Sequence, residues 1–303
     1  METVFPHSLV VYICSPMKLP LLFALSLLLL ASCSPAKKEQ PVSKQEATTF
    51  AKTIESGIKK KDYTTLDNVM DIDLFAEEMM KAADIKKKSS FKEGVKQEWN
   101  KVKFSAEIIK SLGTNGTYQF VKAYEKGGHQ HIVFRLYGDG GLNYHDFELV
   151  KYTNKVMAKD IFIYITGEPL SKTMAQVYST ALQEASANGD AALSQYSKAL
   201  IAMRRYYSQK EYQAAKEEFD RLPESLQNEK AIQLIYLQVA SSIGGDVHQQ
   251  ALDHFEKLFG NDPSAQLALF DVFFLKGDYD KVLQIIDKMD AELQDPFLNT
   301  LRR

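Results

Sequence analysis

Apolar residues recur at helical spacing from about residue 46 onward. Phe50, Ile54 and Ile58 lie four residues apart, which places them on one face of a helix. A similar stripe runs through the region of Trp99, the only tryptophan of the chain. We therefore predict that helices form the first part of this region and that Trp99 packs in the core.

The pattern becomes strand-like after residue 116, where apolar and polar residues alternate. Gly127-Gly128 and Asp139-Gly140 interrupt the alternation, and such dipeptides favour tight hairpin turns. The pattern does not decide whether the segment 107–112 forms a further strand or the end of a helix. The predicted strands are 117–125, 129–137, 142–152 and 155–166.

Helices followed by a run of antiparallel strands indicate α+β architecture. The segments Gly141–Leu149 and Asp160–Glu168 resemble the closing strands of nuclear-transport-factor/ketosteroid-isomerase-like domains. This resemblance implies a cone-like domain over residues 46–168, in which a curved antiparallel sheet wraps a helical layer.

The second half, residues 169–303, is helical and repetitive. Its apolar signature recurs after 36 and then 31 residues, close to the period of about 34 that tetratricopeptide repeats have. The segments resemble such repeats, although the signature Trp is absent and Val282 replaces the usual Ala. A generic antiparallel bundle is the alternative, and Ser171–Ala187 is the expected bridge to the sheet. The three signatures read Tyr212-x₂-Ala215-x₃-Phe219, His248-x₂-Ala251-x₃-Phe255 and Tyr279-x₂-Val282-x₃-Ile286.

The N-terminus carries a targeting signal. Leu19–Leu30 is an apolar run that is shorter than the roughly 20 residues that span a bilayer, and Lys18 precedes it as in a secretory signal. Leu30-Ala31-Ser32-Cys33 resembles the bacterial lipobox. The resemblance implies that residues 1–32 are removed, that translation starts at Met17, and that acyl chains on Cys33 anchor the protein. Residues 33–45 are expected to form a flexible tether.

The residues after Cys33 suggest a location. Ser34 follows the cysteine, and in the family an Asp at this position is associated with retention at the inner membrane. Lys37 and Lys38 differ from the acidic export signals of some Bacteroidetes lipoproteins. We expect a lipid anchor in the bacterial cell envelope, at the outer membrane and facing the periplasm.

Composition excludes several functional classes. The 303 residues contain 37 Lys+Arg and 39 Asp+Glu, for a net charge of −2, which gives no basic surplus for nucleic acid. Cys14 and Cys33 are the only cysteines, too few for a disulfide scaffold or a multi-cysteine metal site. The chain lacks phosphate-loop, HExxH, GxSxG and dinucleotide motifs. No catalytic residue, cofactor or metal is therefore predicted.

The best polar constellation is His129, His131 and Glu148. If Asp139-Gly140 form the turn, His131 lies opposite Glu148, and two His with one carboxylate could bind a divalent cation. We favour instead a solvated strand face with a cross-strand His–Glu pair. The same register sends His145 to the opposite face.

Two functions remain open. In the first, the repeats bind an envelope protein or peptide, with interface candidates Arg204, Arg205, Tyr206 and Tyr207. In the alternative, the cone binds a small molecule or acts as an isomerase or hydrolase. A pocket in the cone decides between them, and its candidate residues are Asn143, His145, Tyr118 and Tyr124.

Overall fold

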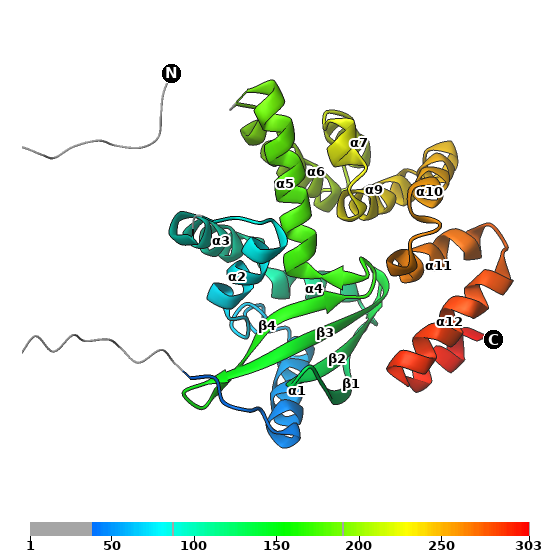
Figure 1. The fold of residues 1–303 in the computed structure, drawn as a ribbon. Coiled ribbons are helices and arrows are strands. Elements are labelled where there is room, and N and C mark those ends of the chain that lie inside the picture. The colour runs from blue at the N-terminus through cyan, green and yellow to red at the C-terminus, as the bar shows by residue number, and fades with distance from the viewer. Residues whose placement is uncertain (1–37, 87, 190, 303) are drawn as a thin grey trace, which may run out of the picture. The chain divides into compact units, whose positions relative to one another are not determined.

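A five-stranded antiparallel sheet forms the middle of the chain, and each strand pairs only with its neighbours in sequence (Figure 1). The computed structural model describes residues 38–86, 88–189 and 191–302. The predictions on residues 1–32, Met17 and Cys33 lie outside the described residues. The strands are β1 Thr117–Lys126, β2 His129–Gly138, β3 Gly141–Tyr152, β4 Lys155–Ile163 and β5 Glu168–Pro169.

The predicted hairpin register is confirmed. Gly138 pairs with Gly141 across the Asp139-Gly140 turn, and His131 pairs with Glu148. The two-residue strand β5 was not predicted, and β4 ends three residues earlier than expected. The open segment 107–112 is helical.

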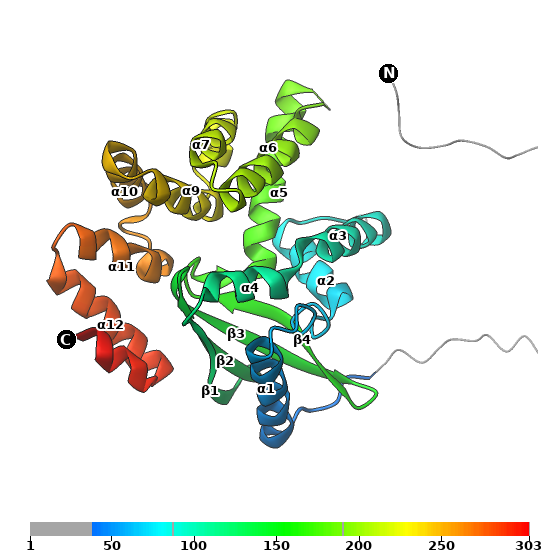
Figure 2. The same ribbon diagram turned by 180° about the vertical axis from the view of Figure 1, so that it is seen from behind.

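Helices from the N-terminal part cover one face of the sheet, called the inner face here, as Figure 2 shows for α1 and α4. Ile132, Phe134 and Phe147 on this face are fully buried and pack against the apolar stripes of the helices. Trp99 lies in this core and is 6% exposed, as predicted. The helices are α1 Lys44–Lys59, α2 Ile72–Ala82, α3 Lys88–Val102 and α4 Phe104–Leu112.

The folded part begins before residue 46, the expected boundary. Helix α1 begins at Lys44, and Ser43 and Glu46 form a capping box at its start, which satisfies two otherwise free backbone N–H groups. The Gln40 N–H already donates to the Lys151 carbonyl at 2.9 Å. The expectation of a flexible tether is therefore wrong for these last residues.

The second half consists of helical hairpins. Helix α6 pairs with α7, α9 with α10 and α11 with α12, and Ala215, Ala251 and Val282 of the predicted signatures are buried. The chain is thus α+β and then helical. The elements are α5 Leu170–Asn188, α6 Ala191–Ser208, α7 Tyr212–Asp220, α8 Glu224–Gln227, α9 Lys230–Ile243, α10 Gly245–Phe259, η1 Pro263–Ala265, α11 Gln266–Leu275, α12 Tyr279–Leu293 and η2 Pro296–Arg302.

Helix α5 is the predicted bridge between the two halves. It packs against α2 and β4 and also against α6. Asp160 of β4 fixes its start, because its carboxylate accepts the backbone N–H of Ser171 at 3.2 Å and the Ser171 hydroxyl. The position of the first helical hairpin thus depends on a buried carboxylate of the sheet.

The C-terminal helices reach the opposite, outer face of the sheet. Val133 and Tyr144 of this face are fully buried and belong to one apolar cluster with Val272, Ile286 and Leu293. Strand alternation alone gave no sign of this cover. Among the described residues, no helix has both the length and the apolar character needed to span a membrane.

Candidate functional site

The predicted polar patch lies on the outer face, but its members form two separate pairs. His129 Nδ1 lies 2.5 Å from Glu148 Oε1, whereas His131 Nδ1 lies 3.0 Å from Asp146 Oδ1. Lys159 Nζ also contacts Glu148, at 3.2 Å. Burial raises the pKa of Glu148, but Lys159 and His129 outweigh this effect and hold it below its usual value.

This patch has the chemistry of structural His–carboxylate hydrogen bonds. Over the described part of the chain, no group of three or more His, Cys, Asp and Glu side chains is arranged to hold a metal ion. A cross-strand His–Glu pair is present as expected, but it joins Glu148 to His129 and not to His131, which lies directly opposite. The face is half-buried rather than solvated, since the two side chains are 30% and 26% exposed.

Tyr124 does not lie near His145, contrary to the pocket prediction. A β-bulge between Phe120 and Lys122 adds one residue to β1, and an extra residue reverses the alternation that follows. Tyr124 therefore turns to the outer face, where its ring stacks on His131 at 5.1 Å and its hydroxyl donates to Asp146. Before the bulge, Tyr118 keeps its inward position.

His145, Tyr118 and Asn143 do come together on the inner face. The Asn143 amide oxygen accepts the backbone N–H groups of Tyr144 and Ile165, so its NH₂ group faces His145 Nε2 at 3.3 Å. Nε2 must then accept, and Nδ1 carries the proton toward the Tyr118 oxygen at 3.1 Å. Burial lowers the pKa of His145 to about 4, which keeps the ring neutral.

Side chains of the protein itself fill the space where the small-molecule hypothesis places a pocket. Phe75, Phe134 and Phe147 are fully buried, and Phe134 packs edge-on against Phe147 at 5.6 Å. The Phe104 ring lies 6.2 Å from that of His145. His145 is thus a packed, hydrogen-bonded core residue.

The tyrosines of the predicted interface cluster contribute to packing. Tyr206 and Tyr207 are partly buried against the core of the first hairpin. Arg205 stacks over Tyr206 at 4.8 Å, and both Arg204 and Arg205 are exposed. The arginines are therefore the most exposed members of this cluster.

A groove between α10, η1, α11 and α12 is the better candidate site. It is a shallow groove, open to solvent, with a volume of about 550 Å³, and the buried side chains Leu269, Phe273 and Ile285 line it. Apolar floors with polar rims are typical of binding sites. The polar residues lining it are Glu256, Asn261, Asp262, Gln266, Lys281, Gln284 and Lys288.

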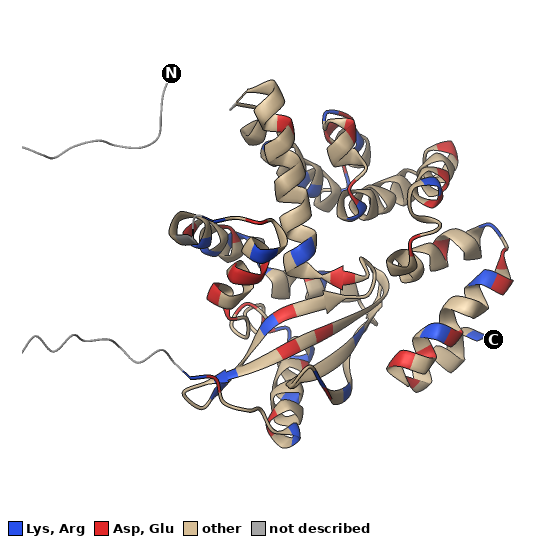
Figure 3. Ribbon diagram, in the orientation of Figure 1, with Lys and Arg blue, Asp and Glu red and all other residues tan. Residues whose placement is uncertain are grey.

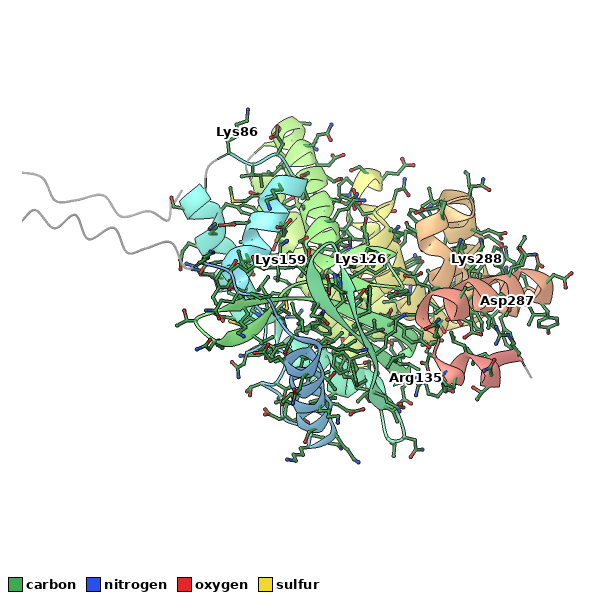
Figure 4. All side chains as sticks on the ribbon, turned by 60° about the horizontal axis from the view of Figure 1, so that its bottom comes forward. Lys86, Lys126, Arg135, Lys159, Asp287 and Lys288 are labelled. Atoms are coloured by element: carbon green, nitrogen blue, oxygen red, sulfur yellow. The ribbon has the colours of Figure 1, made fainter. Side chains whose placement is uncertain are left out.

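The charges on the rim of this groove are partly compensated. Lys281 lies 4.4 Å above the Phe273 ring and 2.9 Å from Asp278. Lys230 and Ser264 hold Asp262, and the pKa of Asp262 lies below its usual value because these bonds outweigh the effect of burial. Lys288 has no ion-pair partner among the described residues and is labelled on α12 in Figure 4.

The sequence carries a signal at α11, which lines this groove with Leu269 and Phe273. Helix α11 reads QLALFDVFFL, which is apolar on all sides, and a helix of this kind is normally buried all round. Here the C-terminal end of α11 remains uncovered outside the groove lining: Phe274 and Leu275 are 51% and 57% exposed, and Tyr279 at the start of α12 is 58% exposed. An uncovered apolar patch of this kind marks an interaction surface.

Comparisons with models of known protein families, with curated proteins and with solved structures find no match for this chain.

Proposed function

We propose that this chain is a bacterial envelope lipoprotein that binds a partner polypeptide through its helical hairpins. Acyl chains on Cys33 hold it at the outer membrane, facing the periplasm. The lipobox-like Leu30–Cys33 segment after an apolar run supports the anchor. Two or more acyl chains make such membrane retention stable.

The groove between α10 and α12 carries the binding proposal. Leu269, Phe273 and Ile285 supply apolar contact area, while the amides of Gln266 and Gln284 offer donors and acceptors to a peptide backbone. The hairpins belong to the tetratricopeptide-like class in this proposal, which rests on the recurring signatures and on the Gly277 turn with φ of 75°. Such repeats commonly form extended binding surfaces.

The sheet and its inner helices act as a spacer in this proposal. The order of helices and strands supports a nuclear-transport-factor-like ancestry for this half, and its filled interior suits a structural role. Since function comes from sites rather than from folds, the groove and not the sheet is where the test belongs.

Site-specific photocrosslinking in intact envelopes tests the groove. A photoreactive residue at Lys288, on the rim, is expected to capture a discrete partner, and the same probe at Gln238 of α9 is the control because Gln238 is exposed outside the groove. The substitution Gln284→Trp fills the groove and should abolish the Lys288 crosslink. Equal capture at both positions, or capture unaffected by Gln284→Trp, would refute the proposal.

A further inference from the structure

One end of the sheet combines two hairpin turns with the entry of the chain into the fold. Because neighbouring strands are antiparallel, the β1–β2 and β3–β4 turns lie at the same end. We call residues 125–128, 151–155 and 38–44 together the turn rim. In Figure 1 the first described residues, before α1, lie beside the β3–β4 turn.

The N-terminal segment is attached to this rim by specific bonds. The Gln40 N–H donates to the Lys151 carbonyl at 2.9 Å, and the Tyr152 hydroxyl donates to Glu39 at 3.2 Å. His129 Nε2 lies 3.2 Å from the other oxygen of Glu39. The chain is therefore held to the sheet from residue 39 onward.

The short remaining length limits how far the turn rim can be from the anchor. Glu39 follows Cys33 by six positions in the sequence, and an extended chain covers at most about 3.5 Å per residue, or about 20 Å. This step rests on the proposed function, because it takes Cys33 as the anchored residue. The turn rim is then the part of the folded unit nearest the lipid.

The charge of the turn rim is opposite to that of the whole chain. Lys38, Lys44, Lys126 and Lys155 are exposed and form no ion pair within the described residues, whereas the rim carboxylates without a Lys or Arg partner are Glu39 and Glu125. Figure 3 shows basic residues at this end of the sheet. Four lysines against two carboxylates give a local surplus of positive charge on a chain whose net charge is −2.

We propose that the turn rim is a docking surface for anionic phospholipid headgroups. Lysines close to an anionic surface attract it, and the attraction fades within about 10 Å at ordinary ionic strength. The segment after Cys33 reaches at most about 20 Å, so it keeps the rim close enough to approach the surface to within that distance. Docking there fixes the orientation of the sheet at the membrane.

Vesicle binding tests this surface without the anchor. The chain from residue 33 with Cys33→Ser contains the whole unit 37–303 and lacks any cysteine. It is expected to bind vesicles of equal phosphatidylglycerol and phosphatidylcholine at low salt, and not vesicles of phosphatidylcholine alone. Lys126→Gln/Lys155→Gln should weaken this binding at least about tenfold, whereas Lys198→Gln/Lys257→Gln removes two exposed lysines elsewhere and should preserve it.

A fluorescent probe on a single introduced cysteine locates the contact. At Asn154 in the β3–β4 turn its emission should change on binding, while at Asp139, in the turn at the other end of the sheet, it should not. Equal binding to both vesicle types, equal loss in both double variants, or equal response of the two probes would overturn the proposal. The mass of residue 33 in the membrane-extracted wild-type protein tests the anchor separately, since the vesicle assay does not depend on acylation.

Discussion

Arg135 of β2 and Asp295, just after α12, form a buried ion pair across 160 residues of sequence. Both Asp295 oxygens accept from the same guanidinium nitrogen, at 2.7 and 2.6 Å, and the Tyr144 hydroxyl donates to one of them at 2.9 Å. Phe297 lies 4.2 Å over the guanidinium. This cluster connects the end of the helical half to the outer face of the sheet, and Arg135 is labelled in Figure 4.

Asp295→Ala is expected to lower the free energy of unfolding by about 3–5 kcal/mol, because it leaves the Arg135 charge buried without a partner. Urea denaturation of wild type and variant measures this loss. The double variant Arg135→Met/Asp295→Leu is the control, since replacing both partners by apolar side chains should recover most of the stability. A loss below about 1 kcal/mol in the single variant would contradict the role given to the pair.

His145→Gln should change how stability depends on pH. The folded-state pKa of His145 is about 4, below the value of about 6.5 in the unfolded chain. The stability that the neutral His145 ring contributes is therefore fully present above pH 6.5. It is lost as the pH falls toward 4, by about 3 kcal/mol in total. Relative to wild type, the variant should gain stability between pH 7 and pH 4.5, and a constant difference across this range would contradict the prediction.

Asp160→Asn should have the opposite pH signature. Burial raises the pKa of Asp160 to about 6 despite its bonds to Ser171, so the folded state holds the proton more tightly than the unfolded state. The contribution of this group is complete below about pH 3.8 and is lost as the pH rises through 6, by about 3 kcal/mol. The free energy of unfolding of the variant, relative to that of wild type, should therefore be highest near pH 7.5 and lowest near pH 4. Denaturation at each pH measures this difference.

Gly167→Ala should destabilise the protein more than an alanine at another glycine of positive φ. Gly167 has a φ of 66°, and a Cβ there would lie 1.8 Å from the Ser264 carbonyl oxygen. Gly277 has a φ of 75° with open space around its Cβ position, so Gly277→Ala costs only the backbone conformation, about 1–2 kcal/mol. Thermal melts of the two variants provide the comparison. Equal melting temperatures would contradict the prediction, because they would mean that the backbone at Ser264 moves aside without a loss of stability.

The β2–β3 register could be predicted because a local signal sets it. The Asp139-Gly140 turn fixes which residues face each other, and the apolar alternation then places His131 opposite Glu148. Tyr124 was misplaced because the bulge after Phe120 interrupts the alternation without any turn residue to mark it. The alternation of apolar and polar residues along a strand does not indicate where a bulge interrupts it.

The cover on the outer face could not be predicted for a different reason. Arg135 occupies an outward position on β2, where a charged residue normally indicates solvent, and its partner Asp295 follows the last long helix. Nothing local to either residue indicates the other. The groove had a usable signal in the all-round apolar character of α11, but that signal alone does not say which side stays open.

The strictly sequential order of the strands has a consequence for how the chain acquires its structure. Each hairpin of the β1-β2-β3-β4-β5 sheet needs only residues already close in sequence, so loop closure costs little entropy and the sheet can assemble early. Its outer face stays exposed until the C-terminal residues are available, and these emerge last when a chain is made or translocated from its N-terminus. Until Asp295 arrives, Arg135 and Tyr144 remain uncovered, and folding is complete only when the last helix docks.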